Sequence, residues 1–204
     1  MARKKEIPRE TFLESGIPRA FWELGVSTYP FSKQALDLVG NFSAKIKECC
    51  TCGAGLVLYG SSFTGKTFLA TLPLKFALVE GISAKYVTLP ALWDSYIDKQ
   101  GFREAVYQSK ILVIDDVLLT KHDGYSRLLG TVLRARSDEG FATVICVELS
   151  KSNTNKKPSL KWPPDYREAM GAKYDKFVKE VYCESSSRAL FKTKTGAERI
   201  FGDA

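Results

Sequence analysis

Histidine, paired cysteines and long apolar runs are all scarce in this chain of 204 residues. His122 is the only histidine, and Cys49, Cys50 and Cys52 stand too close together for the usual two pairs of zinc ligands, so we expect no zinc site. The cysteines number five, and an odd count favours reduced thiols over a disulfide framework. No apolar stretch approaches the length of a membrane span, and the charged first residues lack the core of a signal peptide. We therefore expect a cytoplasmic protein without membrane contact.

Length and charge narrow the class further. A chain of 204 residues has room for one α/β domain with short appendages. The net charge is +7, and residues 151–204 hold 12 Lys/Arg against 7 Asp/Glu, which places +5 of it after the expected core sheet. Such an excess favours polyanionic partners, among them nucleic acid.

Apolar runs alternate with amphipathic stretches along the chain. The expected strands lie at residues 56–59, 84–88, 111–115 and 143–147, with a strand or hairpin at 181–194. The expected helices lie at residues 31–49, 65–80, 88–98, 102–108, 124–138 and 165–179. Residues 1–10 read as a basic tail and 11–30 as a broken lead-in. Alternation of this kind predicts a central five-stranded parallel sheet flanked by helices. The expected division is a tail and lead-in at 1–30 and a single domain at 31–204.

One segment carries a specific signal for phosphate. Residues 60–67 spell GSSFTGKT, which fits the GxxxxGK[ST] phosphate-binding loop, directly after an expected buried strand. Glycines let the backbone N–H groups of such a loop face a phosphate at the N-terminus of the next helix. The predicted nucleotide-binding residues are Gly60, Ser61, Ser62, Phe63, Thr64, Gly65, Lys66, Thr67 and Phe68. The predicted ligands are ATP and Mg²⁺.

An acidic pair supplies the second half of the expected site. Asp115 and Asp116 end a strand of four apolar residues, and open α/β sheets bind their ligands at the carboxyl ends of strands. We expect Asp115, together with the Thr67 hydroxyl, to hold Mg²⁺. Asp116 is the candidate that polarises the attacking water, with Lys66 as the catalytic cation. Two aspartates that simply begin a turn are the plainer alternative.

Four segments of the chain, in this order, resemble the AAA+ ATPases of the DnaC-like helicase loader and IstB-like families. They are SGIPR at 15–19, the loop at 60–70, GISAKYVTLPAL at 81–92 and ILVIDDV at 111–117. The resemblance implies a P-loop NTPase fold of the AAA+ (ASCE) type, without a sizeable C-terminal lid domain. It also implies a Mg²⁺-dependent ATPase that forms a homo-oligomer in the ATP state.

The resemblance also assigns roles where this chain departs from the family pattern. The polar sensor at the end of the fourth strand falls on Glu148, and the arginine finger falls on Lys176. Arg188 matches a late arginine of the family, and Arg167 is a further candidate. A lysine lacks the planar fork of arginine, so we expect slow turnover.

In loaders, the helices after the second strand contact DNA, which here points to Lys99 and Arg103 as contacts for single-stranded DNA. The aromatic residues Trp93, Tyr96 and Tyr107 fit either a stacking groove or core packing. The predicted function is an ATPase of DNA replication, a compact loader of phage type in a bacterial or phage-infected cell, with a replicative helicase as partner. The alternatives are an IstB-like ATPase with a transposase as partner, a P-loop small-molecule kinase, and a module that binds ATP and barely hydrolyses it.

Overall fold

A five-stranded sheet forms the centre of the protein, in a computed structural model that describes residues 6–29, 32–98, 101–118, 123–149, 160 and 178–183. The strands are β1 Gly55–Gly60, β2 Ala84–Thr88, β3 Ile111–Leu118, β4 Ala142–Glu148 and β5 Val178–Tyr182. Their order is β2-β3-β4-β1-β5, and every neighbouring pair is parallel. Strand β4 therefore lies between β1 and β3. The prediction of an all-parallel α/β sheet is confirmed.

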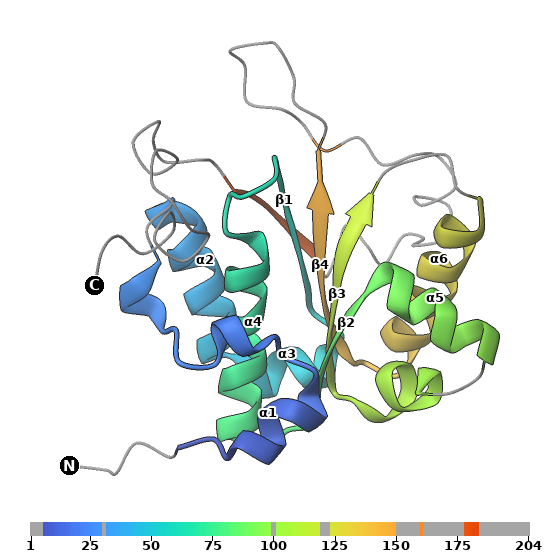
Figure 1. Ribbon diagram of the computed structural model, residues 1–204, viewed down its shortest axis with the longest axis horizontal. Helices are drawn as coiled ribbons and strands as arrows, with labels where there is room; N and C mark the ends of the chain where they lie inside the picture. The colour runs from blue at the N-terminus through green and yellow to red at the C-terminus, as the bar shows by residue number, and fades with distance from the viewer. Residues whose placement is uncertain are drawn as a thin grey trace.

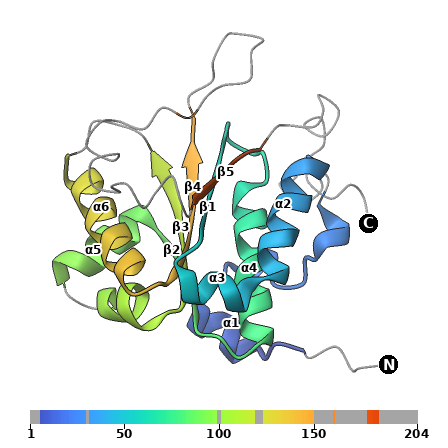
Figure 2. The same ribbon diagram turned by 180° about the vertical axis from the view of Figure 1, so that it is seen from behind.

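Helices cover both faces of this sheet (Figure 1, Figure 2). One face carries α2 (Lys33–Ala44), α3 (Ile46–Cys52) and α4 (Lys66–Val79), and the other carries α5 (Leu89–Asp98) and α6 (Asp123–Asp138). Residues of one strand alternate between the two layers, since side chains along a strand point to opposite faces. In β1, for example, Leu58 belongs to the core under α4 and Val57 to the core under α5 and α6.

The N-terminal segment folds against the α4 side. It contains α1 (Arg9–Ser15) and two short 3-10 helices, η1 (Arg19–Phe21) and η2 (Val26–Thr28). Phe12, Ile17 and Tyr29 are buried in the same cluster as the residues beneath α4. Helix α1 begins at Arg9, inside the stretch predicted to be a tail, and ends at Gly16, whose left-handed backbone terminates it. In the described part of residues 11–30 the chain forms short helical segments and no long helix, as predicted.

The structure corrects two predicted helices. The helix predicted at residues 31–49 is two helices. Lys45 leaves helical geometry at φ −104° and ψ 23°, and it is both the C-cap of α2 and the N-cap of α3. Lys179, predicted to end a helix, lies in β5 beside Leu56 of β1. Pairing with β1 gives Lys179 its strand conformation, and the local sequence does not show that this pairing forms.

A buried arginine organises the connection between α5 and β3. Residues 104–108 form a short π-helix, η3 (Glu104–Gln108). Arg136 of α6 is fully buried, and its NH1 donates to the carbonyl oxygens of Ala105 (3.2 Å), Val106 (2.8 Å) and Ser109 (2.9 Å). Its other nitrogens bond the start of β4. The guanidinium thus satisfies carbonyls at the end of η3 that the helix itself leaves unpaired. None of the helices in the described ranges is long and apolar enough to cross a bilayer.

Candidate nucleotide site

The loop between β1 and α4 has the backbone that a phosphate cradle requires. Gly65 adopts φ +77° immediately before α4, a left-handed conformation that glycine takes at little cost. Gly60 packs against the end of β5, where a Cβ would lie 2.3 Å from the Cys183 carbonyl oxygen. Phe63 also has positive φ, at +60°, and its side chain is exposed. The loop is thus held by two glycines, one by conformation and one by close approach.

Lys66 lies at the centre of this loop. Its side chain is buried, and Nζ donates to the carbonyl oxygens of Gly60 at 3.2 Å and Ser61 at 2.5 Å. The buried Thr64 hydroxyl donates to the Ser61 carbonyl oxygen at 2.9 Å. These bonds keep the ammonium at the mouth of the loop, at the N-terminus of α4, where an anion would be stabilised.

The acidic pair lies near the carboxyl end of β3, which runs on to Leu118, beyond the strand end predicted at residue 115. Asp115 is buried and Asp116 is exposed. The register between β3 and β4 shifts between Ile114 and Val117, and Asp116 adopts φ +56° within this bulge. A bulge redirects a side chain at the end of a strand. Here it separates two adjacent carboxylates, one turned into the protein and one turned to the edge of the sheet.

Both oxygens of the Asp115 carboxylate accept hydrogen bonds. The Asp116 N–H donates to Oδ1 at 2.8 Å, and the Tyr86 hydroxyl of β2 donates to Oδ2 at 2.7 Å. Burial, followed by the Asp115 charge, raises the pKa of the Tyr86 hydroxyl, which therefore remains a donor. Sequence reasoning missed Tyr86. No signal in the sequence marks it: the observed register pairs Thr88 with Asp115, and Tyr86, two residues before Thr88, therefore shares the face of Asp115.

Although Asp116 is exposed by its surface area, partial desolvation by its neighbours raises the pKa of its carboxyl, followed by the charges of Asp115 and Glu148, and Lys66 opposes the shift. Groups from the loop, β3 and β4 therefore influence one another at a single edge. A proton acceptor at such a position gains basicity from its neighbours, as hydrolysis chemistry requires.

Glu148, the predicted sensor, ends β4 directly beside the loop. It pairs with Gly60 of β1 and with Leu118 of β3. The Ser62 hydroxyl donates to its Oε1. The structure thus brings Glu148, Lys66 and the acidic pair to one sheet edge.

The lead-in reaches the loop from the other side. The Tyr29 ring stacks on Phe68 with centroids 5.3 Å apart, and its hydroxyl donates to the Thr64 carbonyl oxygen at 3.4 Å. Lys75 of α4 donates to the carbonyl oxygens of Phe21 and Leu24. Phe68, predicted as a nucleotide contact, is buried and packs against the rings of Phe21 and Tyr29. Its side chain therefore positions the lead-in.

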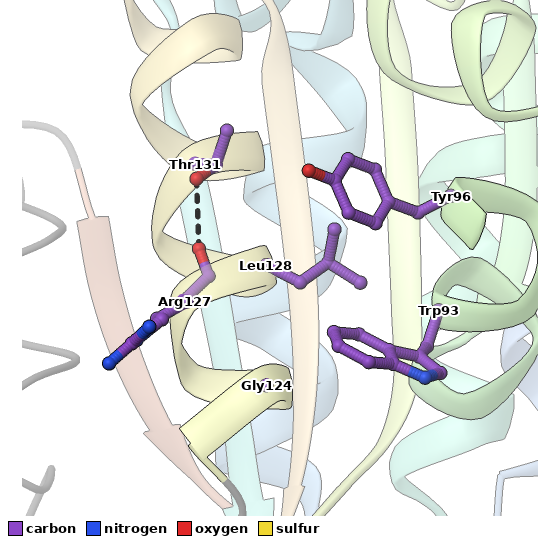
Figure 3. Close-up of a pocket in the computed structure, with 6 residues that line it drawn as sticks. All are labelled: Trp93, Tyr96, Gly124, Arg127, Leu128 and Thr131. Carbon is purple, nitrogen blue, oxygen red and sulfur yellow. Dashed lines mark hydrogen bonds between the residues drawn. The ribbon is translucent and has the colours of Figure 1, made fainter. Parts of the chain in front are cut away.

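A separate cavity of about 350 Å³ lies between α5 and α6 (Figure 3). Trp93 and Tyr96 extend from α5 toward Leu128 of α6, while the Arg127 side chain points away from the two rings. The Trp93 ring covers Gly124, where a Cβ would lie 2.5 Å from the indole. Tyr96 is half exposed and Trp93 partly buried, so the aromatic residues line a surface cavity and also contact the core.

Other predicted residues fall elsewhere. Arg103 is exposed beside η3. Lys99, Lys176 and Arg188 lie outside the described residues, as do Arg167 and His122. Within the described ranges, no three His, Cys, Asp or Glu side chains form a ready metal cage.

Comparison with solved structures identifies the fold. The DnaC helicase loader superposes with a TM-score of 0.64 at 21% identity, over 82% of this chain and 100% of that one. Domain III of the Thermotoga maritima replication initiation protein DnaA gives 0.62 at 18% identity, over 84% and 70% of the two chains. A replication initiator DnaA bound to AMPPCP and single-stranded DNA gives 0.58 at 15% identity, over 92% and 54%. No protein-family model and no curated protein matches the sequence. The fold is that of P-loop AAA+ domains, and the likeness to DnaC inferred from the sequence is confirmed at the level of fold.

Proposed function

We propose that the chain binds and hydrolyses ATP as an AAA+ switch of DNA replication, in the manner of a replicative helicase loader. The observation that carries this proposal is the convergence at one sheet edge of Lys66 in its glycine-bounded loop, Asp115 and Asp116. The solved structures with the same fold include a helicase loader and a replication initiator bound to a triphosphate analogue.

The residues present fit a triphosphate with a divalent cation. Residues Gly60 to Thr67 form the cradle, and Lys66 supplies a positive charge beside it. Thr67 is the second residue of α4 and offers a hydroxyl, and Asp115 is a fixed carboxylate across the edge. Hydroxyl and carboxylate oxygens are the kind of ligand that Mg²⁺ takes. When bound, Mg²⁺ would neutralise charge on the phosphates.

Hydrolysis in this proposal rests on Asp116. Its carboxylate is exposed at the sheet edge, next to a carboxylate that is held by two donors. A carboxylate with a raised pKa is a better acceptor for the proton of an attacking water. Lys176 and Arg188 remain proposed as groups that act across an interface between copies of the chain.

Single-stranded DNA is the proposed second ligand. The cavity of Trp93 and Tyr96 offers aromatic faces on which bases stack, and Arg103 is exposed on the same connection after β2. Lys99 belongs to the same proposal. One of the solved neighbours is a DnaA bound to single-stranded DNA.

The alternatives differ in their partner or chemistry. An IstB-like ATPase would bind a transposase in place of a replicative helicase. A small-molecule kinase needs free arginines over the acceptor, yet Arg136 of α6 is fully buried and bonded to backbone carbonyls, which disfavours that reading. A weakly hydrolysing ATP module is favoured by the Ser62–Glu148 contact, which links the loop to the sensor position.

The test combines ATPase rate and oligomer size, each measured with and without single-stranded DNA and in each nucleotide state. Turnover that DNA stimulates, together with assembly in ATP, supports the proposal. Turnover that requires a nucleoside or sugar acceptor would instead assign a kinase. Capture of native partners then separates the branches, because a replicative helicase in the eluate indicates a loader and a transposase indicates the IstB-like role.

A further inference from the structure

Glu148 has a fixed place beside the phosphate loop. It ends β4, which is hydrogen-bonded to β1 on one side and to β3 on the other. The next residue, Leu149, donates its N–H to the Gly60 carbonyl oxygen at 3.0 Å. The backbone at Glu148 is therefore held at the level where the loop leaves β1, and only the side chain can move away.

The side chain of Glu148 faces the loop. Cys146, two residues earlier, is buried in the core beneath α4, and side chains two apart on a strand share a face. The Ser62 hydroxyl donates to Glu148 Oε1, and Glu148 is half-buried. A carboxylate thus lies against the third residue of the predicted phosphate-binding loop.

Charge at this edge is mostly negative. Among the described residues of the loop and the adjoining strand ends, Lys66 is the cation, and Asp115, Asp116 and Glu148 are carboxylates. A triphosphate adds charge at its outermost phosphate, whereas a diphosphate ends before that point. Repulsion between Glu148 and the outer phosphate is strong where water is partly excluded, unless a divalent cation screens it.

We propose that Glu148 is a specificity-determining residue which makes binding of the triphosphate, more than that of the diphosphate, conditional on a divalent cation. The proposal rests on the proposed function, since it concerns the same nucleotide site. Without the cation, a bound triphosphate leaves two negative groups facing each other, the Glu148 carboxylate and the outer phosphate. With the cation, the same approach is neutralised. A diphosphate lacks the outer phosphate, so its repulsion from Glu148 and its need for the cation are both smaller.

The experiment measures dissociation constants for ADP and for a non-hydrolysable ATP analogue, each with Mg²⁺ and with EDTA. For each nucleotide, the ratio of the constants in EDTA and in Mg²⁺ gives its cation dependence. In the wild-type protein we expect this ratio to be at least about tenfold larger for the triphosphate than for ADP, an excess of about 1.4 kcal/mol.

Two variants separate charge from hydrogen bonding. Glu148→Gln keeps an acceptor for Ser62 and removes the charge, so the excess should fall to less than about threefold, mainly through tighter triphosphate binding in EDTA. Ser62→Ala keeps the charge and removes the hydroxyl, so the excess should persist. Equal excess in Glu148→Gln and the wild type would overturn the proposal, as would its loss in Ser62→Ala alone.

Thermal unfolding and a third variant distinguish a loss of charge from a loss of fold. Thermal unfolding of each variant shows whether the fold is retained, and Glu148→Asp, which retains the charge, should keep most of the excess if Glu148→Gln unfolds. Wild-type protein that binds neither nucleotide in Mg²⁺ would refute the proposed function itself. Wild-type protein that binds both, with no triphosphate excess, would refute only the role of Glu148.

Discussion

The hydroxyl of Tyr86 donates a 2.7 Å hydrogen bond to Oδ2 of Asp115, across the pairing of β2 with β3. The Asp116 N–H donates to the other carboxylate oxygen. The orientation of the Asp115 carboxylate is therefore determined by two donors, a side chain of β2 and the next backbone N–H of β3. A side chain held this way is already placed before any ligand binds, which lowers the entropy lost on binding.

Tyr86→Phe should destabilise the fold and weaken the response to Mg²⁺. The change leaves one oxygen of a buried carboxylate without its donor, a loss of about 1–3 kcal/mol in the free energy of unfolding. Chemical denaturation measures that loss, and a Mg²⁺ titration of ATPase activity should show a higher half-saturating concentration. Tyr107→Phe, at a tyrosine that is 47% exposed, is the matched control. Equal stability of the Tyr86 variant and the wild type would contradict the assigned contact.

Lys66→Ala and Asp116→Asn should separate binding from turnover. Loss of the Lys66 ammonium should weaken ATP binding by roughly tenfold to a hundredfold and abolish assembly that depends on nucleotide. Asp116→Asn should bind ATP normally and lower kcat by about a hundredfold or more, because an amide does not accept the proton. Isothermal titration and steady-state kinetics measure these effects, with the exposed Asp37→Asn as control. Normal hydrolysis by Asp116→Asn would refute its proposed role.

Gly60→Ala should disrupt the loop. The added Cβ would meet the Cys183 carbonyl oxygen at 2.3 Å, and neither backbone can yield without breaking strand pairing, so the expected cost is about 2 kcal/mol or more. Gly40→Ala in α2 is the matched control, since a Cβ there has nothing within 4 Å and should stabilise the helix by about 1 kcal/mol. Thermal unfolding of both variants tests the pair, and similar shifts would contradict the close approach.

The free energy of unfolding should depend on pH through Lys75, the lysine of α4 that donates to carbonyl oxygens of the lead-in. Burial lowers the pKa of this lysine from its ordinary 10.5 to about 8. Between those values the unfolded chain binds the proton more tightly, so stability should rise as pH increases from about 8 to 10.5. Below pH 8 the cost of burying the charge is fully present. Since Lys75 is partly exposed, the rise should be about 1–2 kcal/mol.

The comparison with Lys75→Met isolates this effect, because other groups that titrate in the same range contribute equally to both proteins. The free energy of unfolding of the wild type minus that of Lys75→Met should become more positive as pH rises over that range, because only the wild type gains stability from loss of the Lys75 proton. Lys47→Met, at a surface lysine paired with Glu80 at 2.5 Å, should show no such growth. A constant difference for Lys75 would mean that its ammonium is well solvated.

Local sequence predicted the parts of this fold that depend on local chemistry. The loop at Gly60 and the buried strand that carries Asp115 follow from residue types and spacing alone. The left-handed Asp116, the Tyr86 donor and the Ser62–Glu148 contact depend on which strands become neighbours. Those relationships join residues 29 and 86 positions apart, and no periodicity encodes them.

Arg136 shows the same limit. In the sequence it is one of several arginines on an amphipathic helix, and the expected place for it is the surface. In the structure it is fully buried and caps η3. Arg136→Met should therefore cost at least about 3 kcal/mol, because several backbone carbonyls lose a charged donor, whereas the exposed Arg134→Met should change stability by less than about 0.5 kcal/mol. Denaturant unfolding of the two variants measures the contrast.

The position of β4 between β1 and β3 fixes the width of the nucleotide site. The loop leaves β1 and the acidic pair lies near the carboxyl end of β3, so the two halves stand about two strand spacings apart, roughly 9.6 Å. Backbone hydrogen bonds of the β1–β4 and β4–β3 ladders maintain that separation. Exchanges of charged or hydrogen-bonding side chains at the site can therefore change its charge and its donors while the distance between cradle and carboxylates, which the backbone sets, stays the same.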